Sequence, residues 1–80
     1  MYINEQVSKS LGKIWESAHH LESDILELLV ELEQHKKDLK GHDFVTMIDC
    51  NIEPAVQQAK IKTVEVQALV NYCEALIDNF

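Results

Sequence analysis

One stretch of the sequence decides the fold: it is Val7–Leu39, VSKSLGKIWESAHHLESDILELLVELEQHKKDL. Its apolar residues recur at alternating spacings of four and three, the heptad pattern of a helix that packs against another helix along one stripe. The stripe consists of Val7, Leu11, Ile14, Ala18, Leu21, Ile25, Leu28, Leu32, His35 and Leu39. Glu5 near the start and lysines near the end suit the helix dipole, so the pattern predicts a helix over about residues 4–40.

A short turn and a second helix are expected next. Gly41 is the type of residue that ends helices in the left-handed conformation, and Asp43 is a suitable N-cap. A second heptad stripe then runs through Val45, Ile48, Ile52, Ala55, Ala59, Lys62, Val66, Leu69, Cys73, Leu76 and Phe80. Because a turn at 41–42 is short, helices over 4–40 and 43–79 must be antiparallel neighbours. We therefore predict an all-α fold, a coiled-coil-like two-helix hairpin that forms one domain over residues 1–80.

The two stripes agree in register. Pairing Leu39 with Val45 gives each stripe position on one helix a facing position on the other. Small residues then lie opposite large ones, as in the pairs Leu28–Ala55 and Ile25–Ala59, which favours interdigitated packing.

Pro54 lies inside the second helical pattern and allows two interpretations. Proline removes the backbone hydrogen bond to the carbonyl of Cys50, yet the spacing of three and four continues through it, which favours a kink. The alternative is a helix that ends near Ile52 and a new one that starts with Pro54 at its first position, after Glu53.

A second apolar stripe flanks the first and has no obvious cover within a two-helix hairpin. We expect it to bind a protein partner or a second copy of the chain, and its residues are Trp15, Leu26, Leu29, Val30, Val56, Val70 and Ile77. On the same edge, Lys36 is predicted to lie beside Asp49. The opposite edge is polar and acidic. A homodimeric four-helix bundle and a groove for a foreign helix are both compatible with this pattern.

Composition narrows the possible partners. Fourteen carboxylates against seven lysines give a net charge of −7, which repels nucleic acid and makes it an unexpected partner. We expect no signal peptide and no membrane span, and hence a cytoplasmic protein in which Cys50 and Cys73 remain thiols.

Motifs that carry chemistry are sparse. Glu16 and His19 have the Glu-x-x-His spacing of helical di-metal sites, but a second such motif is missing and the stripe places both on the outer face. His35 near the turn could titrate or simply be a tolerated polar residue. Lys62 interrupts the stripe, and we expect its amine to reach water near Asp24 or Glu65. The sequence predicts no enzymatic activity, no cofactor and no metal site.

The segment from Leu28 to Phe44, centred on ELEQHKKDLKG, and the following IEPAVQQA from Ile52 to Ala59 resemble the small helical-hairpin cochaperones of type III secretion needle subunits. The resemblance extends over roughly residues 21–80 and is one of size and pattern. It implies a protein that shields an aggregation-prone helical partner before export.

These observations lead to one main functional expectation. The chain should be a non-enzymatic module that acts by helix–helix packing, as a small adaptor or chaperone for a helical partner. The first alternative is a homo-oligomeric structural or regulatory bundle without a client. The second is a metal-binding four-helix bundle.

Overall fold

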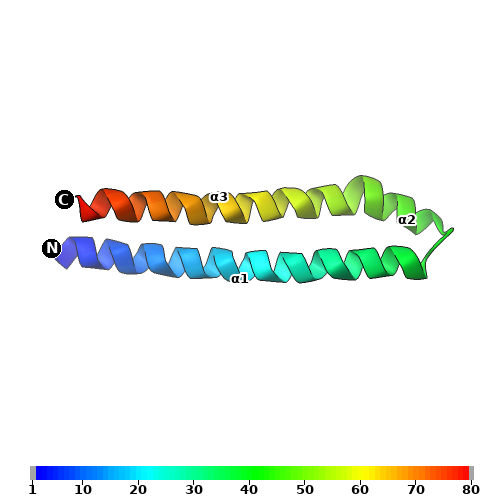
Figure 1. Ribbon diagram of the computed structural model, residues 1–80, viewed down its shortest axis with the longest axis horizontal. Coiled ribbons are helices and arrows are strands. Elements are labelled where there is room, and N and C mark those ends of the chain that lie inside the picture. Colours follow the sequence, from blue (N-terminus) through cyan, green and yellow to red (C-terminus); the bar gives the residue numbers. More distant parts are fainter. Residues whose placement is uncertain (1, 80) are drawn as a thin grey trace.

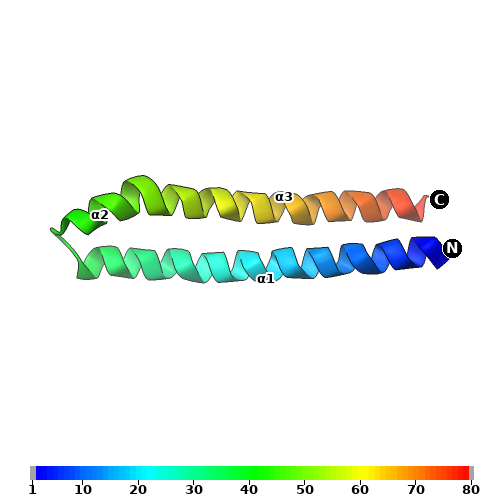
Figure 2. The ribbon, with the colours of Figure 1, turned by 180° about the vertical axis from the view of Figure 1, so that it is seen from behind.

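The computed structural model describes residues 2–79 and is a helical hairpin (Figure 1). Helix α1 spans Tyr2–Asp38, α2 spans Asp43–Met47, a π-helical turn spans Ile48–Ile52, and α3 spans Glu53–Asp78. Helices α1 and α3 run antiparallel and side by side in both views, so the two ends of the chain lie at the same end of the molecule (Figures 1 and 2). The predicted all-α hairpin is confirmed, whereas the stripe position predicted for Phe80 lies outside the described residues.

The turn between the helices depends on Gly41 and His42. Gly41 has φ +85°, the left-handed conformation expected of it, and His42 donates its amide to the carbonyl of Leu39 at 2.8 Å. His42 is also the N-cap of α2, because its Nδ1 accepts the amide of Phe44 at 3.1 Å. The predicted N-cap, Asp43, is wrong by one residue: Asp43 is the first residue of α2.

Pro54 follows a π-helical turn. The amide of Glu53 donates to the carbonyl of Ile48, five residues earlier, and both residues have right-handed helical dihedrals. A proline ring in a regular α-helix would press against the carbonyl four residues before it, and the wider turn relieves this conflict. The ribbon bulges away from α1 at this point in both views (Figures 1 and 2). Helical conformation therefore continues through the turn, and Pro54 lies in the first turn of α3.

The π turn changes which face of α3 meets α1. One extra residue in a helical turn rotates all later residues by about 100° around the axis. The contact positions accordingly move one residue along the chain: Thr63 and Val70 are buried, with 6% and 5% of their surface exposed, whereas Leu69 is 60% exposed. The predicted stripe on this helix is therefore wrong after Ile52, and Ala55 and Ala59 do not face α1 as buried residues.

Helix α1 uses half of its predicted stripe. Ala18, Ile25 and Leu32 are buried as expected. The alternate stripe positions, Ile14, Leu21 and Leu28, are exposed. His35, a fourth such position, is exposed as well. The residue directly after each of the four takes its place in the contact: Trp15, Glu22, Leu29 and Lys36 are all half-buried. Both sets keep the three–four spacing with the buried residues, so the second set packs against α3 as regularly as the first could.

Candidate interaction surface

The residues predicted to form an uncovered edge are divided by the structure. Trp15, Leu29, Val56 and Ile77 are half-buried and Val70 is buried, all in the contact between α1 and α3. The chain itself therefore covers Val70 and part of the surface of the other four, and the expected binding of these five residues to a partner stays a prediction. The other two remain accessible: Leu26 is 44% exposed and Val30 is 71% exposed.

Lys36 links three carboxylates at the turn end of the hairpin. Its Nζ lies 2.8 Å from Glu33 Oε1, 2.8 Å from Asp49 Oδ1 and 2.9 Å from Glu53 Oε2. The pairing with Asp49 confirms the prediction. Hydrogen bonds to Asp49, then to Glu33 and Glu53, raise the pKa of Lys36 far above its ordinary value, so the ammonium ion stays charged. Lys36 thus ties α1 to the π turn and to the start of α3.

The contact between α1 and α3 is partly polar along its whole length. Gln67 donates from Nε2 to Glu22 Oε1 at 2.9 Å, and Ser8 donates from Oγ to Glu74 Oε2 at 2.8 Å. Thr63 donates its hydroxyl to the carbonyl of Lys60, within its own helix, at 2.7 Å. Among the described residues, every buried side-chain nitrogen or oxygen has a hydrogen-bond partner. These polar contacts specify the register of the hairpin, since a slip would leave half-buried polar groups unpaired.

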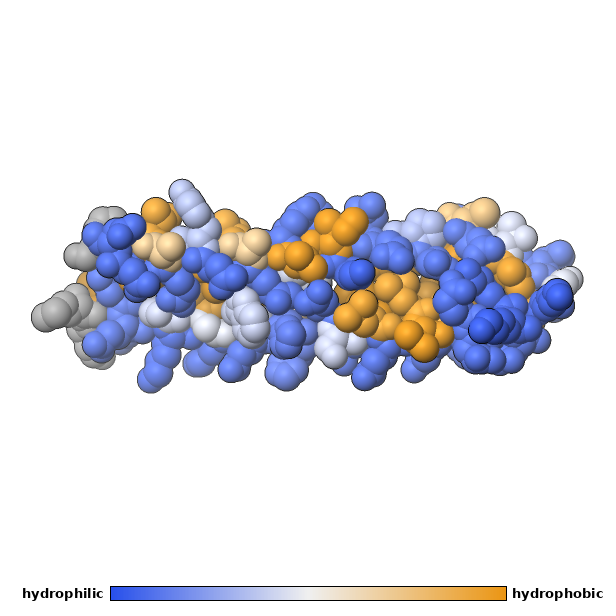
Figure 3. Space-filling view, in the orientation of Figure 1, coloured by the Kyte–Doolittle hydropathy of each residue, from blue (hydrophilic) through white to orange (hydrophobic). Residues whose placement is uncertain are grey.

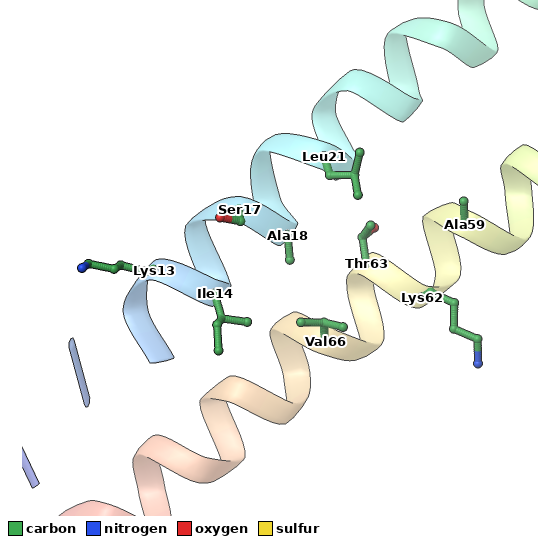
Figure 4. Close-up of a pocket in the computed structure, with 9 residues that line it drawn as sticks. All are labelled: Lys13, Ile14, Ser17, Ala18, Leu21, Ala59, Lys62, Thr63 and Val66. Atoms are coloured by element: carbon green, nitrogen blue, oxygen red, sulfur yellow. The ribbon is translucent and has the colours of Figure 1, made fainter. Parts of the chain in front are cut away.

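A groove of about 580 Å³ lies beside this contact, open to solvent along one side of the hairpin. Ile14, Ala18 and Leu21 point from α1 toward α3, and Thr63 points back toward them (Figure 4). The remaining lining residues are Lys13, Ser17, Ala59, Lys62 and Val66. Lys13 and Lys62 point away from the groove, which leaves an apolar floor between two cations (Figure 4).

The apolar side of the groove continues beyond its walls. Leu28 lies one heptad after Leu21 on α1, and Leu69 and Leu76 follow Val66 at helical spacing on α3; all are exposed. We call this surface the groove face: Ile14, Leu21, Leu28, Ala59, Val66, Leu69 and Leu76. The space-filling view shows that apolar residues also break the hydrophilic surface of the hairpin elsewhere, with a patch toward the turn end (Figure 3).

Lys62 behaves as the sequence predicts. It is 74% exposed at its side chain, and its Nζ lies 3.3 Å from Glu65 Oε2. The amine therefore reaches water and a carboxylate instead of the hairpin contact. This leaves the apolar floor of the groove free of a buried charge.

The histidine and cysteine side chains form no evident centre for chemistry. His19 stacks on Trp15 with ring centroids 5.0 Å apart, and its Nδ1 lies 3.9 Å from Glu22. His35 is exposed, and Cys50 and Cys73 are free thiols. Within residues 2–79, no group of three or more metal-binding side chains comes together, Glu16 and His19 included.

Sequence reasoning missed the groove face as a surface because it assigned those residues to the hairpin contact. The sequence did contain a signal for it. Helix α1 carries apolar residues at three heptad positions, and this stripe is wider than a single contact with α3 can cover. The same pattern allows α1 to face α3 either with Leu21 and Leu28 or with Glu22 and Leu29 beside its buried residues. The π turn sets which face of α3 meets α1, and the pattern of α1 alone does not choose between its own two flanks.

The fold and the groove face define a helical hairpin with an open apolar side. No family model, curated protein or solved structure matches the chain. None of the helices in the described part of the chain has a stretch long and apolar enough to cross a membrane.

Proposed function

We propose that this chain is a protein-interaction module that packs the groove face against helices of another chain. The observation that carries the proposal is the exposure of three large apolar residues, Ile14, Leu21 and Leu69, around an apolar groove. Large apolar residues that are exposed next to one another mark a site of contact with other molecules. An amphipathic helix places an apolar residue at every third or fourth position and so fits a groove between two helices.

The chemistry of the groove favours packing over catalysis. The hydroxyl of Thr63 at its floor is used by the backbone of α3, and the two lysines at its rim point outward. Apart from the hydroxyl of Ser17, the other lining residues offer apolar contact. An adaptor or chaperone would cover this floor with a client helix, and a self-associating bundle would cover it with its own copy.

Photo-crosslinking in the native cells tests the proposal. The photoreactive amino acid p-benzoylphenylalanine is placed at Leu21 in the full chain, and in a matched chain at Leu26. Both are exposed leucines of α1, and they lie about 140° apart around the helix axis. We expect several-fold more crosslinked protein, a copy of the chain or another helical protein, from position 21. Equal yields at the two positions, or none at either, would contradict the proposal.

A further inference from the structure

We infer that a second copy of this chain covers the groove face, so that two hairpins form a symmetric four-helix bundle. The inference rests on the proposed function of the groove face and names its occupant. Four properties of the hairpin support it: its exposed area, its shape, the apolar pattern of α1 and the order of charges along α1.

The exposed area is too large for a chain that stays alone. A compact monomer of 9.2 kDa exposes about 4,900 Å². The hairpin exposes 6179 Å², an excess of roughly 1,250 Å². Stable protein interfaces bury about 800 Å² on each partner, and obligate dimers bury more. The excess is therefore of the size that each chain of an obligate dimer removes from water.

The shape supports the same conclusion. The radius of gyration is 18.0 Å, against about 12 Å for a compact domain of this length. The shortest dimension is 12 Å, about the diameter of one helix, so the two helices form a single layer. Domains bury a core between at least two layers. A second hairpin laid on the groove face supplies the missing layer.

The helix pattern identifies the geometry of that layer. Each helix of a four-helix bundle contacts two neighbours, and so it needs a wider apolar stripe than a two-stranded coiled coil. Helix α1 has such a stripe: Ala18, Ile25 and Leu32 are buried at its centre, Trp15 and Leu29 are half-buried on one side, and Leu21, which lines the groove, and Leu28 are exposed on the other. The groove leucines would then form the centre of the bundle core.

The charges along α1 favour a copy over a foreign helix. Lys13 lies at one end of the groove, whereas Asp24 and Glu31 follow the groove residue Ser17 at heptad spacing and are exposed. A two-fold axis near Leu21 reverses this order in the second copy, which brings Lys13 of each chain toward Glu31 of the other. The charges at the two ends of the groove are thus complementary to those of a second copy, despite a net charge of −7 on each chain.

Sedimentation equilibrium across a concentration series tests the inference, with circular dichroism to check folding. We expect twice the chain mass of 9.2 kDa for the wild type. The variant Leu21→Glu puts a charge on each side of the two-fold axis and should weaken dimerisation by roughly 100-fold or more. The matched variant Leu26→Glu should remain a dimer. Leu69→Glu, on α3, repeats the test if Leu21→Glu loses helix content.

A measurement on the unaltered chain provides a second readout. In a mixture of isotope-labelled and unlabelled wild-type chains, we expect intermolecular nuclear Overhauser effects from the methyl groups of Ile14, Leu21 and Val66. A folded wild type of single chain mass at all concentrations would overturn the inference. So would a dimer that Leu26→Glu disrupts and Leu21→Glu and Leu69→Glu leave intact. A foreign protein crosslinked at position 21 to such a monomer would overturn the inference alone and leave the proposed function standing.

Discussion

Lys36 and Asp49 face each other across the hairpin, with Nζ 2.8 Å from Oδ1, at the point where α1 meets the π turn. Asp49 belongs to that turn, and Glu53, the next partner of Lys36, is the first residue of α3. The ammonium group of Lys36 thus contacts both the π turn and the start of α3, where the face of the helix that meets α1 shifts by one residue. We attribute to it a role in fixing the position of the π turn against α1.

Replacing Lys36 by Met tests this role. The change leaves Glu33, Asp49 and Glu53 close together without their cation, so their repulsion should lower the melting temperature. Added salt should recover part of the loss, because it screens that repulsion. Thermal melts followed by circular dichroism at low and high salt measure both effects. Lys37→Met, at an exposed neighbouring position, is the control, and equal losses in the two variants would contradict the assignment.

The stabilisation by Lys36 should also depend on pH in one direction. Its pKa is raised in the folded chain by hydrogen bonds to Asp49, Glu33 and Glu53. Such a group contributes fully below its unfolded pKa, about 10.4 for lysine, and the contribution is lost as pH rises above that value. The melting temperatures of wild type and Lys36→Met should therefore differ by a constant amount from pH 8 to about 10 and converge above it. A difference that grows above pH 10.4 would be inconsistent with this account.

The π turn can be removed without rotating α3. Deleting Asn51 takes out the extra residue, and Pro54→Ala restores the amide that a regular α-helix requires. The double change should keep Thr63 and Val70 on the contact face, with helix content and thermal stability no lower than those of the wild type. Amide spectra and thermal melts provide the measurement.

A deletion in regular helix is the control for that experiment. Asn71 is exposed in α3, and its deletion rotates the following residues by about 100°, so the contacts of Glu74 and Ile77 with α1 should be lost. Equal stability of the two deletion variants would mean that the π turn does not set the face of α3.

Val70 should be among the residues that contribute most to the hairpin contact. Val70→Ala removes two methyl groups from a site that is 5% exposed, and we expect it to lower the free energy of unfolding by roughly 1 to 3 kcal/mol. Val64→Ala, on the other flank of α3 and 45% exposed, should change it by less than about 0.5 kcal/mol. Denaturant titrations compare the two. A larger loss for Val64→Ala would place a different face of α3 against α1.

The sequence predicts the hairpin well because its signals are local and repeated. The spacing from Leu11 to Leu39 defines a long helix, and Gly41 adopts the left-handed turn expected of it. The ion pair between Lys36 and Asp49 also follows from antiparallel pairing. Periodicity cannot predict how one proline changes the helical turn before it. The apolar spacing continues unbroken past Pro54, whereas the π turn holds one residue more than an α-helical turn and rotates the residues that follow.

That single residue explains why the predicted interaction residues of α3 and the observed groove face differ. The rotation of α3 places Val70 inside the hairpin, and α1 meets it with the flank that contains Trp15. Leu21 and Leu69 then take the exposed position. Of the predicted interaction residues, Leu26 and Val30 remain exposed as well, so apolar surface is accessible on both flanks of α1.

The polar pair Glu22–Gln67 offers the last test, because it lies where a purely apolar contact would be expected. Helix α1 has apolar residues on both sides of Ala18 and Ile25, so it could present either flank to α3. The hydrogen bond between Gln67 and Glu22 forms in only one of these arrangements and therefore favours it. The double variant Glu22→Leu and Gln67→Leu should raise the free energy of unfolding by roughly 1 kcal/mol. The same variant should populate more than one arrangement, seen as doubled amide signals and mixed masses in sedimentation.

Gln67→Leu alone should be destabilising, since it leaves the half-buried carboxylate of Glu22 without its donor at 2.9 Å. A double variant with one set of signals and one mass would mean that apolar packing alone selects the face of α1, and that the polar pair does not set the register.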